Sequence, residues 1–501
     1  MTILTLCLYI AIVASILTFI MLKWSNTVQS VWISFLQNFC GSLFIFSGWV
    51  KAVDPMGTAF KMVEYFEEFE NTAKSSFLKF MADIFPFMAK YAIEFSVFTI
   101  ILEIVIGVML IIGYKPKWAS ILFFLIMIFF TVLTGFTFLT GYVPKEANFF
   151  EFGKWAAFAE SNMRVTNCGC FGDFLKLTPE TSFKKDLLLM IPAIIFMFSW
   201  KKFHSLFTSS LRLGITSFAT VALFLFCLAN YKWNEPMFDF RPFKKGADIR
   251  SLKEAEAKAM GDVKIEFWRL KNKSSSETKI VSDNDYMSNI KAYKADWEVV
   301  EQIKSKPSIP NTKISDFALY DLEGNDVTEE VLAEPRSRIM INIPKLYYTS
   351  QTFTTAIQDT IWKLDTVKAT DGKEFTTMKS IAEIKEKKEK KNSYTWDEKY
   401  KNLLTSKILP FLDSIYQDSI KAFFVVGGVS EDALKALFSQ INVTNPIYTA
   451  DDVLLKTIMR SNPGILLWRN GKIISKWHHN HIPTLDEMRR DFLDWKAPLI
   501  H

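Results

Sequence analysis

The sequence predicts a polytopic α-helical membrane bundle followed by a soluble α/β domain. Half of its 501 residues are hydrophobic, and nearly all the long apolar runs lie before residue 231. The remainder has the mixed composition of a soluble protein, and the length allows two or more domains. The net charge of +6 comes from dispersed Lys and Arg balanced by Asp and Glu, so the composition does not indicate nucleic-acid binding.

About six segments are apolar enough to cross a membrane, since a spanning helix needs about 20 such residues. They are residues 3–22, 31–50, 91–113, 118–141, 187–200 and 211–230. The fifth is short, so its helix is expected either to begin near Phe183 or to tilt little in the membrane. The first has no basic residue before it and no small-residue cleavage site, which favours a retained helix over a signal peptide.

Lysines in the short loops predict the orientation of the bundle. Lys23, the pair Lys115 and Lys117, and the pair Lys201 and Lys202 mark one side, which is therefore predicted to be cytoplasmic. The loops 51–90 and 142–182 and everything after residue 231 are then on the opposite side. The pattern in 51–90 predicts an amphipathic helix that lies on the membrane surface.

Two cysteines lie in the outer loop 142–182, separated by Gly169. Cys168 and Cys170 form the one close pair among five cysteines, because Cys7, Cys40 and Cys227 each lie alone in an apolar run. On the oxidising side of a membrane, such a pair can be a redox-active dithiol or a structural disulfide clip. A metal site is the third reading, although two thiolates supply only half of a tetrahedral zinc shell.

Four polar residues in or beside the expected spans are candidate functional residues. Glu103 lies near the middle of 91–113, where a carboxylate is costly and therefore suggests a function or a hydrogen bond inside the bundle. Glu94 is nearer the outer surface and is expected at the interface. Lys51 and Asp54, at the outer end of 31–50, are expected to pair with each other or to reach the interface.

Three motifs resemble the DoxX/MauE group of redox-associated membrane proteins over roughly 31–250. They are Cys168-Gly-Cys-Phe-Gly-Asp173 before Lys176-Leu-Thr-Pro, the stretch Phe44–Gly57 with its Asp54-Pro55, and Asp239–Gly246. The resemblance implies thiol–disulfide chemistry in the cell envelope, and MauE-like proteins are linked to maturation of a disulfide-rich periplasmic enzyme. It also implies the bacterial inner membrane, with the C-terminal domain periplasmic. The helix in 1–30 is an addition to the usual pattern.

The soluble part reads as strands and helices in alternation. Expected strands are Val263–Lys271, Thr278–Ser282, Asp316–Leu322, Arg338–Ile343, Lys421–Gly427, Pro446–Tyr448, Ile465–Arg469 and Lys472–Trp477, with Trp297–Lys304 a strand or a short helix. Expected helices are Thr328–Leu332, a long polar region that includes Ile381–Lys391, Ile408–Ile420 and Glu431–Gln440. Asn470-Gly471 between two apolar strands predicts a hairpin.

This order, and the stretch Ser461–Gly471 in particular, resembles a thioredoxin-like domain of the TlpA type over roughly 310–495. The resemblance implies a cis peptide bond before Pro463, on the face where such folds dock a partner strand. Pro344–Thr349 occupies the place of the usual Cys-x-x-Cys, and no cysteine follows residue 227. The tail is therefore predicted to bind rather than to exchange thiols.

The predicted organisation has four parts: an extra N-terminal transmembrane helix (1–30), a DoxX/MauE-like domain (31–230), a linker with a small β-rich segment (231–310), and a thioredoxin-like domain without redox cysteines (311–501). His478, His479 and His481 follow a strand directly, so their rings do not all point one way and a polar loop rim is favoured over a metal site. No metal is predicted.

Two functions remain open. In the first, Cys168 and Cys170 take part in envelope thiol–disulfide exchange with a periplasmic or membrane protein that docks on the tail. In the second, the protein is a non-catalytic, membrane-anchored scaffold subunit, and the cysteine pair is a structural clip. A third reading places a small-molecule or lipid pocket near Glu103. No cofactor is required, although a quinone or proton step in the bundle remains open.

Overall fold

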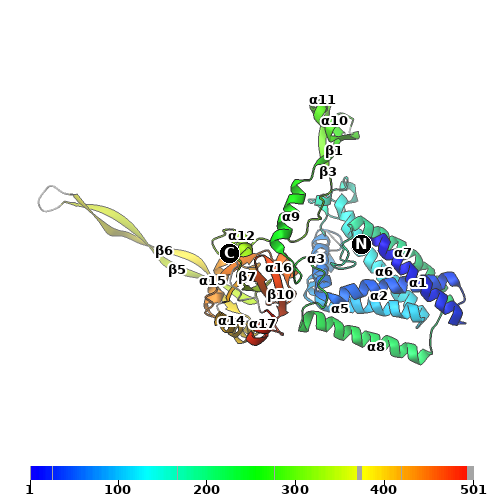
Figure 1. The fold of residues 1–501 in the computed structure, drawn as a ribbon. Helices are drawn as coiled ribbons and strands as arrows, with labels where there is room; N and C mark the ends of the chain where they lie inside the picture. Colours follow the sequence, from blue (N-terminus) through cyan, green and yellow to red (C-terminus); the bar gives the residue numbers. More distant parts are fainter. Residues whose placement is uncertain are drawn as a thin grey trace. The chain divides into compact units, whose positions relative to one another are not determined.

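The computed structural model describes residues 2–24, 26–165, 168–275, 277–368, 375–418 and 420–492. These residues form two compact units, coloured along the chain in Figure 1. The helical unit comprises Met1–Ala247 with two later segments, Thr457–Gly464 and Ser475–His481. The α/β unit comprises Asp248–Lys456, Ile465–Ile474 and Ile482–His501.

Long helices that lie alongside one another make up most of the helical unit (Figure 1). The α-helices are α1 (Ile3–Trp24), α2 (Val31–Val53), α3 (Pro55–Lys74), α4 (Ile84–Lys90), α5 (Ala92–Ile112), α6 (Pro116–Leu139), α7 (Pro179–Ser199) and α8 (Ser209–Leu228). Among the described residues, five helices are long and apolar enough to cross a membrane: Ile3–Lys23, Val31–Val53, Ala92–Ile112, Pro116–Tyr142 and Ser209–Trp233. The chain is therefore described as a multi-pass membrane protein.

The expected span over 187–200 is different in the structure. It forms the C-terminal part of α7, which begins at Pro179, where the side chain of Thr178 accepts a hydrogen bond from the amide of Thr181. The first turns of α7 contain charged residues, so the helix is not among the five candidate spans. A good N-cap followed by Pro at the first helical position explains why the helix starts earlier than its apolar run.

Small residues let α2 and α5 approach closely. A Cβ atom on Gly41 would lie 2.7 Å from Ile111 Cγ1 and 2.8 Å from the carbonyl oxygen of Gly107. The two backbones therefore meet at Gly41 and Gly107, which is how close contacts form between membrane helices.

The expected amphipathic helix in 51–90 is confirmed as α3. Asp54 ends α2 and also caps α3, since its side chain accepts a hydrogen bond from the amide of Gly57 at 3.1 Å. The buried face of α3 includes Ala59, Met62, Tyr65 and Phe66. The sharp change of direction at Asp54-Pro55 places the end of α2 beside the start of α3.

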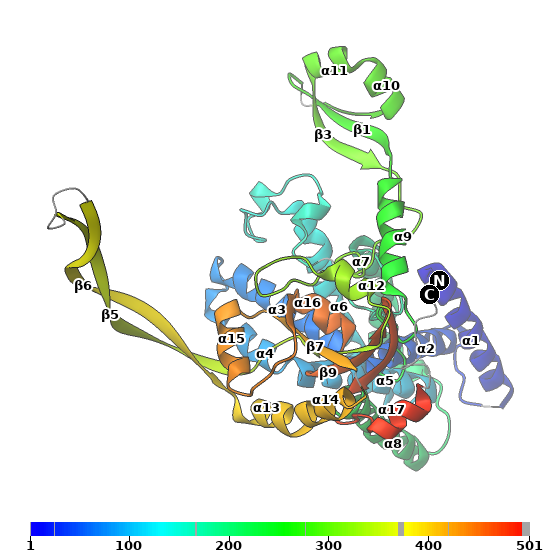
Figure 2. The same ribbon diagram turned by 60° about the vertical axis from the view of Figure 1, so that its left-hand side comes forward.

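A five-stranded sheet forms the core of the α/β unit, in the order β10-β9-β4-β7-β8. Its strands are β4 (Arg338–Ile343), β7 (Lys421–Gly427), β8 (Ile447–Ala450), β9 (Gly464–Arg469) and β10 (Lys472–His478), and β4, β7 and β8 pair in parallel. Its helices are α12 (Thr328–Ala333), α13 (Glu398–Leu403), α14 (Leu409–Tyr416), α15 (Glu431–Ser439), α16 (Asp452–Ile458) and α17 (Leu485–Asp491). The expected strands here are confirmed to within a few residues (Figure 2).

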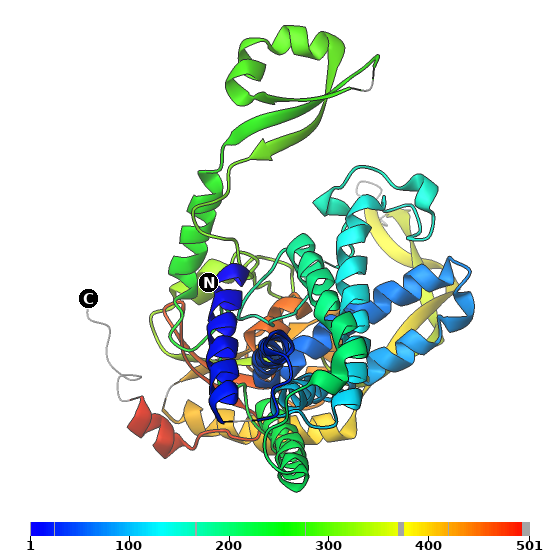
Figure 3. The ribbon, with the colours of Figure 1, turned by 90° about the vertical axis from the view of Figure 1, so that its right-hand side faces the viewer.

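A second, smaller sheet follows α9 (Ile249–Gly261), as Figure 3 shows in green. Strands β1 (Ile265–Asn272), β2 (Thr278–Ser282) and β3 (Trp297–Lys304) pair antiparallel in the order β2-β1-β3. Helices α10 (Asp283–Ser288) and α11 (Ile290–Asp296) accompany them, with Trp268 stacked on Tyr286. The segment Trp297–Lys304 is thus a strand, which settles the choice that the sequence left open.

Two expectations for the α/β unit were wrong. The region around Ile381–Lys391, expected to be helical, lies in β6 (Phe375–Trp396), which pairs antiparallel with β5 (Tyr348–Lys368) in a long two-stranded ribbon (Figure 2). The Thr-rich sequence of β5 favours strand pairing, and the backbone bonds to it override the helix preference of the Glu and Lys residues. Asp316–Leu322 is not a regular strand; Tyr320 makes isolated bridges to Asp326 and Thr449.

Candidate functional site

Four of the residues singled out in the sequence line one cavity inside the helical unit. They are Lys51, Glu103, Cys168 and Cys170, which come from α2, α5 and the loop before α7. The cavity has a volume of about 60 Å³, which is room for several water molecules. The structure therefore brings the cysteine pair and the intramembrane charges into one site.

The loop that carries the two cysteines turns tightly and is held against α2. Gly169 and Gly172 have φ angles of +62° and +52°, a region that residues with a side chain seldom adopt. The amide of Gly172 donates to the carbonyl oxygen of Gly169 at 3.1 Å, and Ser47 Oγ of α2 donates to the carbonyl oxygen of Cys170 at 3.0 Å. The hydrogen bond from Ser47 thus holds the backbone of Cys170 against α2.

The two thiols are free, and each has the largest single effect on the pKa of the other, which makes them chemically unequal. The thiol of Cys168 lowers the pKa of Cys170 to about 7 against the effect of burial, and the nearby ammonium of Lys185 acts in the same direction. The thiol of Cys170, together with burial, raises the pKa of Cys168. Cys170 is therefore the better thiolate, and Cys168 is the thiol that keeps its proton.

An ion pair on α7, which the sequence reasoning missed, also lines this cavity. Lys185 Nζ lies 2.7 Å from Asp186 Oδ1, and Thr134 of α6 donates to Asp186 Oδ2 at 3.0 Å. Lys185 also lies over the ring of Phe171 in the cysteine loop, 5.5 Å from its centroid. The sequence does carry a signal for this pair, since ionisable residues at the edge of an apolar run suggest a function. Lys185 and Asp186 lie just before the apolar run 187–200.

Lys51 and Glu103 form a buried ion pair, with Nζ and Oε2 separated by 2.7 Å. Their side chains are 7% and 3% exposed, and Lys51 also lies 4.6 Å from the centroid of the Phe130 ring. This corrects the expectation that Lys51 pairs with Asp54 or reaches the interface. A charge in a bundle interior needs a partner of opposite sign, and Glu103 on α5 provides it.

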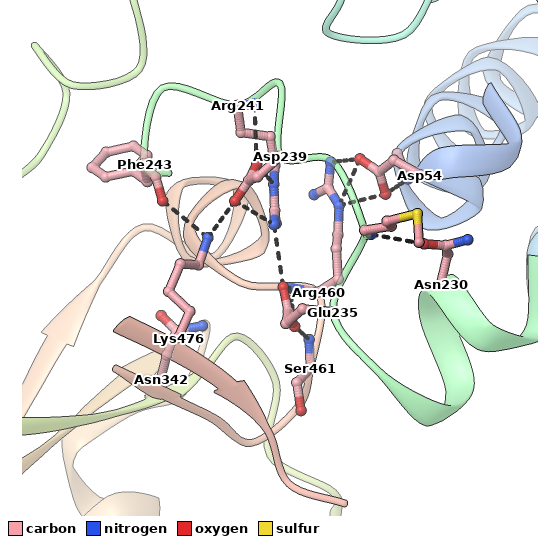
Figure 4. Close-up of polar contacts among 12 residues, drawn as sticks. Asp54, Asn230, Glu235, Asp239, Arg241, Phe243, Asn342, Arg460, Ser461 and Lys476 are labelled. Atoms are coloured by element: carbon pink, nitrogen blue, oxygen red, sulfur yellow. Dashed lines mark hydrogen bonds and ion pairs between the residues drawn. The ribbon is translucent and has the colours of Figure 1, made fainter. Parts of the chain in front are cut away.

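Asp54 binds Arg460, which follows it by 406 residues in the chain. Arg460 Nε lies 2.9 and 3.0 Å from the two carboxylate oxygens, and one terminal nitrogen lies 2.7 Å from Oδ2 (Figure 4). Burial alone would raise the pKa of Asp54, but Arg460 outweighs it and lowers that pKa. The sequence does not predict this pair, because no local sequence pattern links Asp54 to Arg460.

The remaining candidates lie outside the cavity. Glu94 is exposed on α5. The Asn462–Pro463 bond is cis, as predicted, and Pro463 is buried, with its carbonyl oxygen accepting from Ser461 Oγ at 2.5 Å. His478 and His479 lie ring against ring at 4.1 Å. The residues that the structure describes contain no group of three or more metal-ligating side chains of the His, Cys, Asp and Glu types.

A larger cavity in the helical unit is lined by phenylalanine rings and other mostly apolar side chains. Its volume is about 390 Å³, and the rings that line it are Phe69, Phe85, Phe136, Phe149, Phe150 and Phe183. Glu103 does not line it. The cavity beside Glu103 has room for water, whereas this separate cavity has room for an apolar molecule.

Comparison with known families gives one match. Residues 29–144 match the family model described as "Methylamine utilisation protein MauE", which covers α2 to α6 and includes Lys51, Tyr65 and Glu103. The cysteine pair lies beyond the matched residues. No curated protein and no solved structure matches the chain. The match and the five apolar helices together indicate a multi-pass membrane protein whose N-terminal part is similar to MauE.

Proposed function

We propose that this protein is a thiol–disulfide exchange component of the cell envelope, with Cys168 and Cys170 as its redox pair. The observation that carries the proposal is that the two thiols line one cavity with the largely buried ammonium of Lys185. A cation next to a thiol favours the thiolate, which is the attacking form in disulfide exchange. A thiol in a merely structural clip does not need such a neighbour.

The geometry supports a specific order of steps. The thiolate of Cys170 attacks one sulfur of a partner's disulfide, so that a mixed disulfide forms and the partner's other sulfur leaves as a thiolate. Cys168 then loses its proton to water in the cavity and attacks the sulfur of Cys170, which releases the second partner thiolate. The partner gains two electrons and two protons, and Cys168 and Cys170 end as a disulfide. The reverse sequence oxidises a partner dithiol.

The two ion pairs have a supporting role in this proposal. Exchange alters the charge on Cys170, and Lys185 offsets that charge when the thiolate forms. Lys51 and Glu103 together carry no net charge and line the same cavity as the thiols, which has room for water. In this proposal, water in the cavity takes up the proton that Cys168 must release.

The proposal includes the periplasmic location of the thiol site and of the α/β unit, together with a binding role for that unit. The lysine distribution in the short loops supports this orientation in the bacterial inner membrane. The sheet order β10-β9-β4-β7-β8 and the cis-proline before β9 support a thioredoxin-like fold. Because no cysteine follows residue 227, this unit would bind a partner and leave the exchange to the bundle.

The alternative is a non-catalytic scaffold in which the cysteine pair clips a loop. The absence of cysteine from the sequence of the α/β unit favours this reading, since a docking unit without a nucleophile also suits a structural subunit. The alternative predicts that the pair is either permanently oxidised or chemically inert.

Trapping of mixed disulfides distinguishes the two functions. In cells, Cys168→Ser should accumulate mixed disulfides through Cys170, because the resolving thiol is missing. Cys170→Ser should trap few or none, since Cys168 holds its proton. Acid quench, thiol alkylation and non-reducing gels give the readout, with Cys7→Ser as the control. A pair that is fully oxidised and resists mild reductant, with nothing trapped in either variant, would leave the scaffold as the better reading.

A further inference from the structure

Arg460 lies where two acidic residues near the thiol site meet. Besides its contacts with Asp54, its guanidinium lies 3.7 Å from Asp173 Oδ2 and over the ring of Phe60, 5.3 Å from the centroid. Its side chain is 5% exposed. Asp54 and Asp173 line the same small cavity together with Arg241, and Asp173 also lies 3.6 Å from Lys176. Without Arg460, the two carboxylates would share this largely buried space with less positive charge beside them.

The backbone around Arg460 is held as firmly as its side chain. Both the amide of Arg460, at 3.1 Å, and the amide of Ser461, at 2.6 Å, donate to Glu235 Oε1 (Figure 4). Glu235 in turn accepts from Arg241 at 3.2 Å. These hydrogen bonds fix the backbone of the segment Thr457–Gly464, which helps to hold the Arg460 side chain in place.

Asp54 and Asp173 are both linked closely to Cys170. Asp173 follows Cys170 by three residues and comes directly after the turn in which the amide of Gly172 donates to the carbonyl oxygen of Gly169. Asp54 follows α2, whose Ser47 binds the carbonyl oxygen of Cys170. The guanidinium thus joins the two structural elements that hold Cys170, the loop on one side and the helix end on the other.

We propose that Arg460 is a positioning residue for the Cys168–Cys170 pair, so that the segment Thr457–Gly464 sets the reactivity of thiols that lie far earlier in the chain. The proposal rests on the redox function proposed above. Its physical basis is that loss of the cation leaves Asp54 and Asp173 to repel each other, which displaces the turn and with it Cys170. Any partner that pulled on this segment would alter the thiol pair through the same contact.

The test is the thiol–disulfide equilibrium of the pair in the purified full-length protein in detergent. The protein is equilibrated with glutathione buffers of graded ratio, quenched in acid and alkylated, and the oxidised fraction is measured on gels. We expect Arg460→Met and Asp173→Asn each to change the equilibrium constant about 5-fold or more, the range typical of coupled sites. The double variant should change it no further than the larger single variant, because both remove one contact. Arg460→Lys should lie between wild type and Arg460→Met.

Arg338→Met is the matched control. Arg338 is also a largely buried cation, with its side chain 15% exposed, but it pairs with Glu334 at 2.6 Å in the α/β unit and not with the residues around Arg460. Its loss should leave the equilibrium constant within about 2-fold of wild type, and thermal unfolding shows which variants are folded. Asp173 is 29% exposed, so Asp173→Asn keeps the test decisive even if Arg460→Met does not fold.

Two failures can be told apart. If the wild-type pair exchanges with glutathione but folded Asp173→Asn and Arg460→Met match it, or if Arg338→Met shifts the equilibrium as much, the positioning role is wrong and the redox function stands. If the wild-type pair does not exchange at all, the redox function fails. Positioning is then tested by the alkylation rate of Cys170 in a Cys168→Ser background, where an Arg460→Met rate equal to that of its parent would also overturn the positioning role.

Discussion

At the scale of single residues, Cys170 owes its character to two neighbours, the thiol of Cys168 and the ammonium of Lys185. Both lower its pKa, and they do so in a loop whose backbone is fixed by Ser47. Cys170 is therefore present as both thiol and thiolate near neutral pH, which suits exchange in either direction.

Replacing Cys168 by Ala should slow the alkylation of Cys170 at neutral pH. The variant removes the thiol that contributes most to the lowered pKa, so the pKa of Cys170 should rise from about 7 toward the usual value of about 8.5. The thiolate fraction at pH 7 then falls from about one half to a few per cent. Iodoacetamide rates between pH 5 and 10, followed by peptide mass spectrometry, measure the effect.

Lys185→Met should act in the same direction and more weakly, and Cys7→Ala should have no effect on Cys170. At pH 10 the Cys168→Ala rate should approach that of wild type, since Cys170 is then ionised in both proteins. Equal rates at pH 7 in wild type and Cys168→Ala would show that the thiol of Cys168 does not govern the pKa of Cys170.

Removal of one member of the buried pair Lys51–Glu103 should strongly destabilise the fold, whereas replacement of both by apolar residues should cost little stability. Lys51→Met or Glu103→Leu leaves one charge without its partner, which typically destabilises a protein by about 3–5 kcal/mol. The double variant Lys51→Met with Glu103→Leu removes both charges and should recover most of the loss. Thermal unfolding of the protein in detergent, followed by tryptophan fluorescence, measures all three variants.

Lys184→Met is the control, because Lys184 and Glu180 form an exposed pair on α7 with side chains 68% and 55% exposed. Such pairs contribute little to stability. A double variant that is destabilised by the sum of the two single effects would mean that Lys51 and Glu103 stabilise the fold separately rather than as a pair.

Sequence reasoning identified residues of this site but not their partners. Cys168, Cys170, Glu103 and Lys51 each carry a local signal, namely a close thiol pair or a charge in an apolar run. Which charge meets which depends on how helices pack, and the partner of Asp54 lies 406 residues away. A single sequence holds no record of such distances, so Arg460 could be found only in the structure.

At the scale of elements, the contact between α2 and α5 depends on Gly41. Gly41→Ala should destabilise the bundle by about 1–3 kcal/mol, because the added Cβ meets both Ile111 and the backbone of Gly107 and the backbone cannot yield cheaply. Gly214→Ala is the matched control, since Gly214 lies in α8 with nothing within 4 Å of the added Cβ. That change should be neutral or stabilising by up to about 1 kcal/mol.

Thermal unfolding of the two glycine variants in detergent gives the comparison directly. If Gly41→Ala and Gly214→Ala are equally stable, α2 and α5 do not meet at Gly41 as the structure has it, and the position of Lys51 relative to Glu103 would need to be reconsidered.

Elements were predictable where one local signal dominated. Arg338–Ile343 and Lys421–Gly427 are continuous apolar runs and form β4 and β7 with the expected bounds. The Glu- and Lys-rich run Ile381–Lys391 has strong helix formers but lies in β6, because its structure is decided by hydrogen bonds to β5. Pairing between strands is a property of two segments, which the composition of one cannot reveal.

At the scale of the whole chain, an ion network joins three distant parts of the helical unit. Asp54 ends α2, Glu235, Asp239 and Arg241 follow α8, and Arg460 and Lys476 belong to the late segments of that unit (Figure 4). Because six charged groups are largely buried together, the network stabilises the fold only while its carboxylates stay ionised.

Asp239 should therefore make the folded protein sensitive to acid. Burial alone would raise its pKa, but Arg241 at 2.7 Å and Lys476 at 2.8 Å outweigh this effect and lower the pKa to about 2. The unfolded value is about 3.9, so the stabilisation is fully present above about pH 5 and is lost as the pH falls toward 2. A depression of this size corresponds to about 2.6 kcal/mol, of which about 1 kcal/mol is lost by pH 3.

Asp239→Asn should abolish this contribution, so the variant is less stable than wild type at pH 6 and the difference narrows by about 1 kcal/mol at pH 3. Chemical unfolding of the full-length protein in detergent at both pH values measures it. Asp316→Asn is the control for loss of an exposed carboxylate, since Asp316 and its partner Lys313 are 54% and 45% exposed. A deficit of Asp239→Asn that stays the same at pH 6 and pH 3 would mean that Asp239 contributes shape and hydrogen bonds to the network but not an ionised carboxylate.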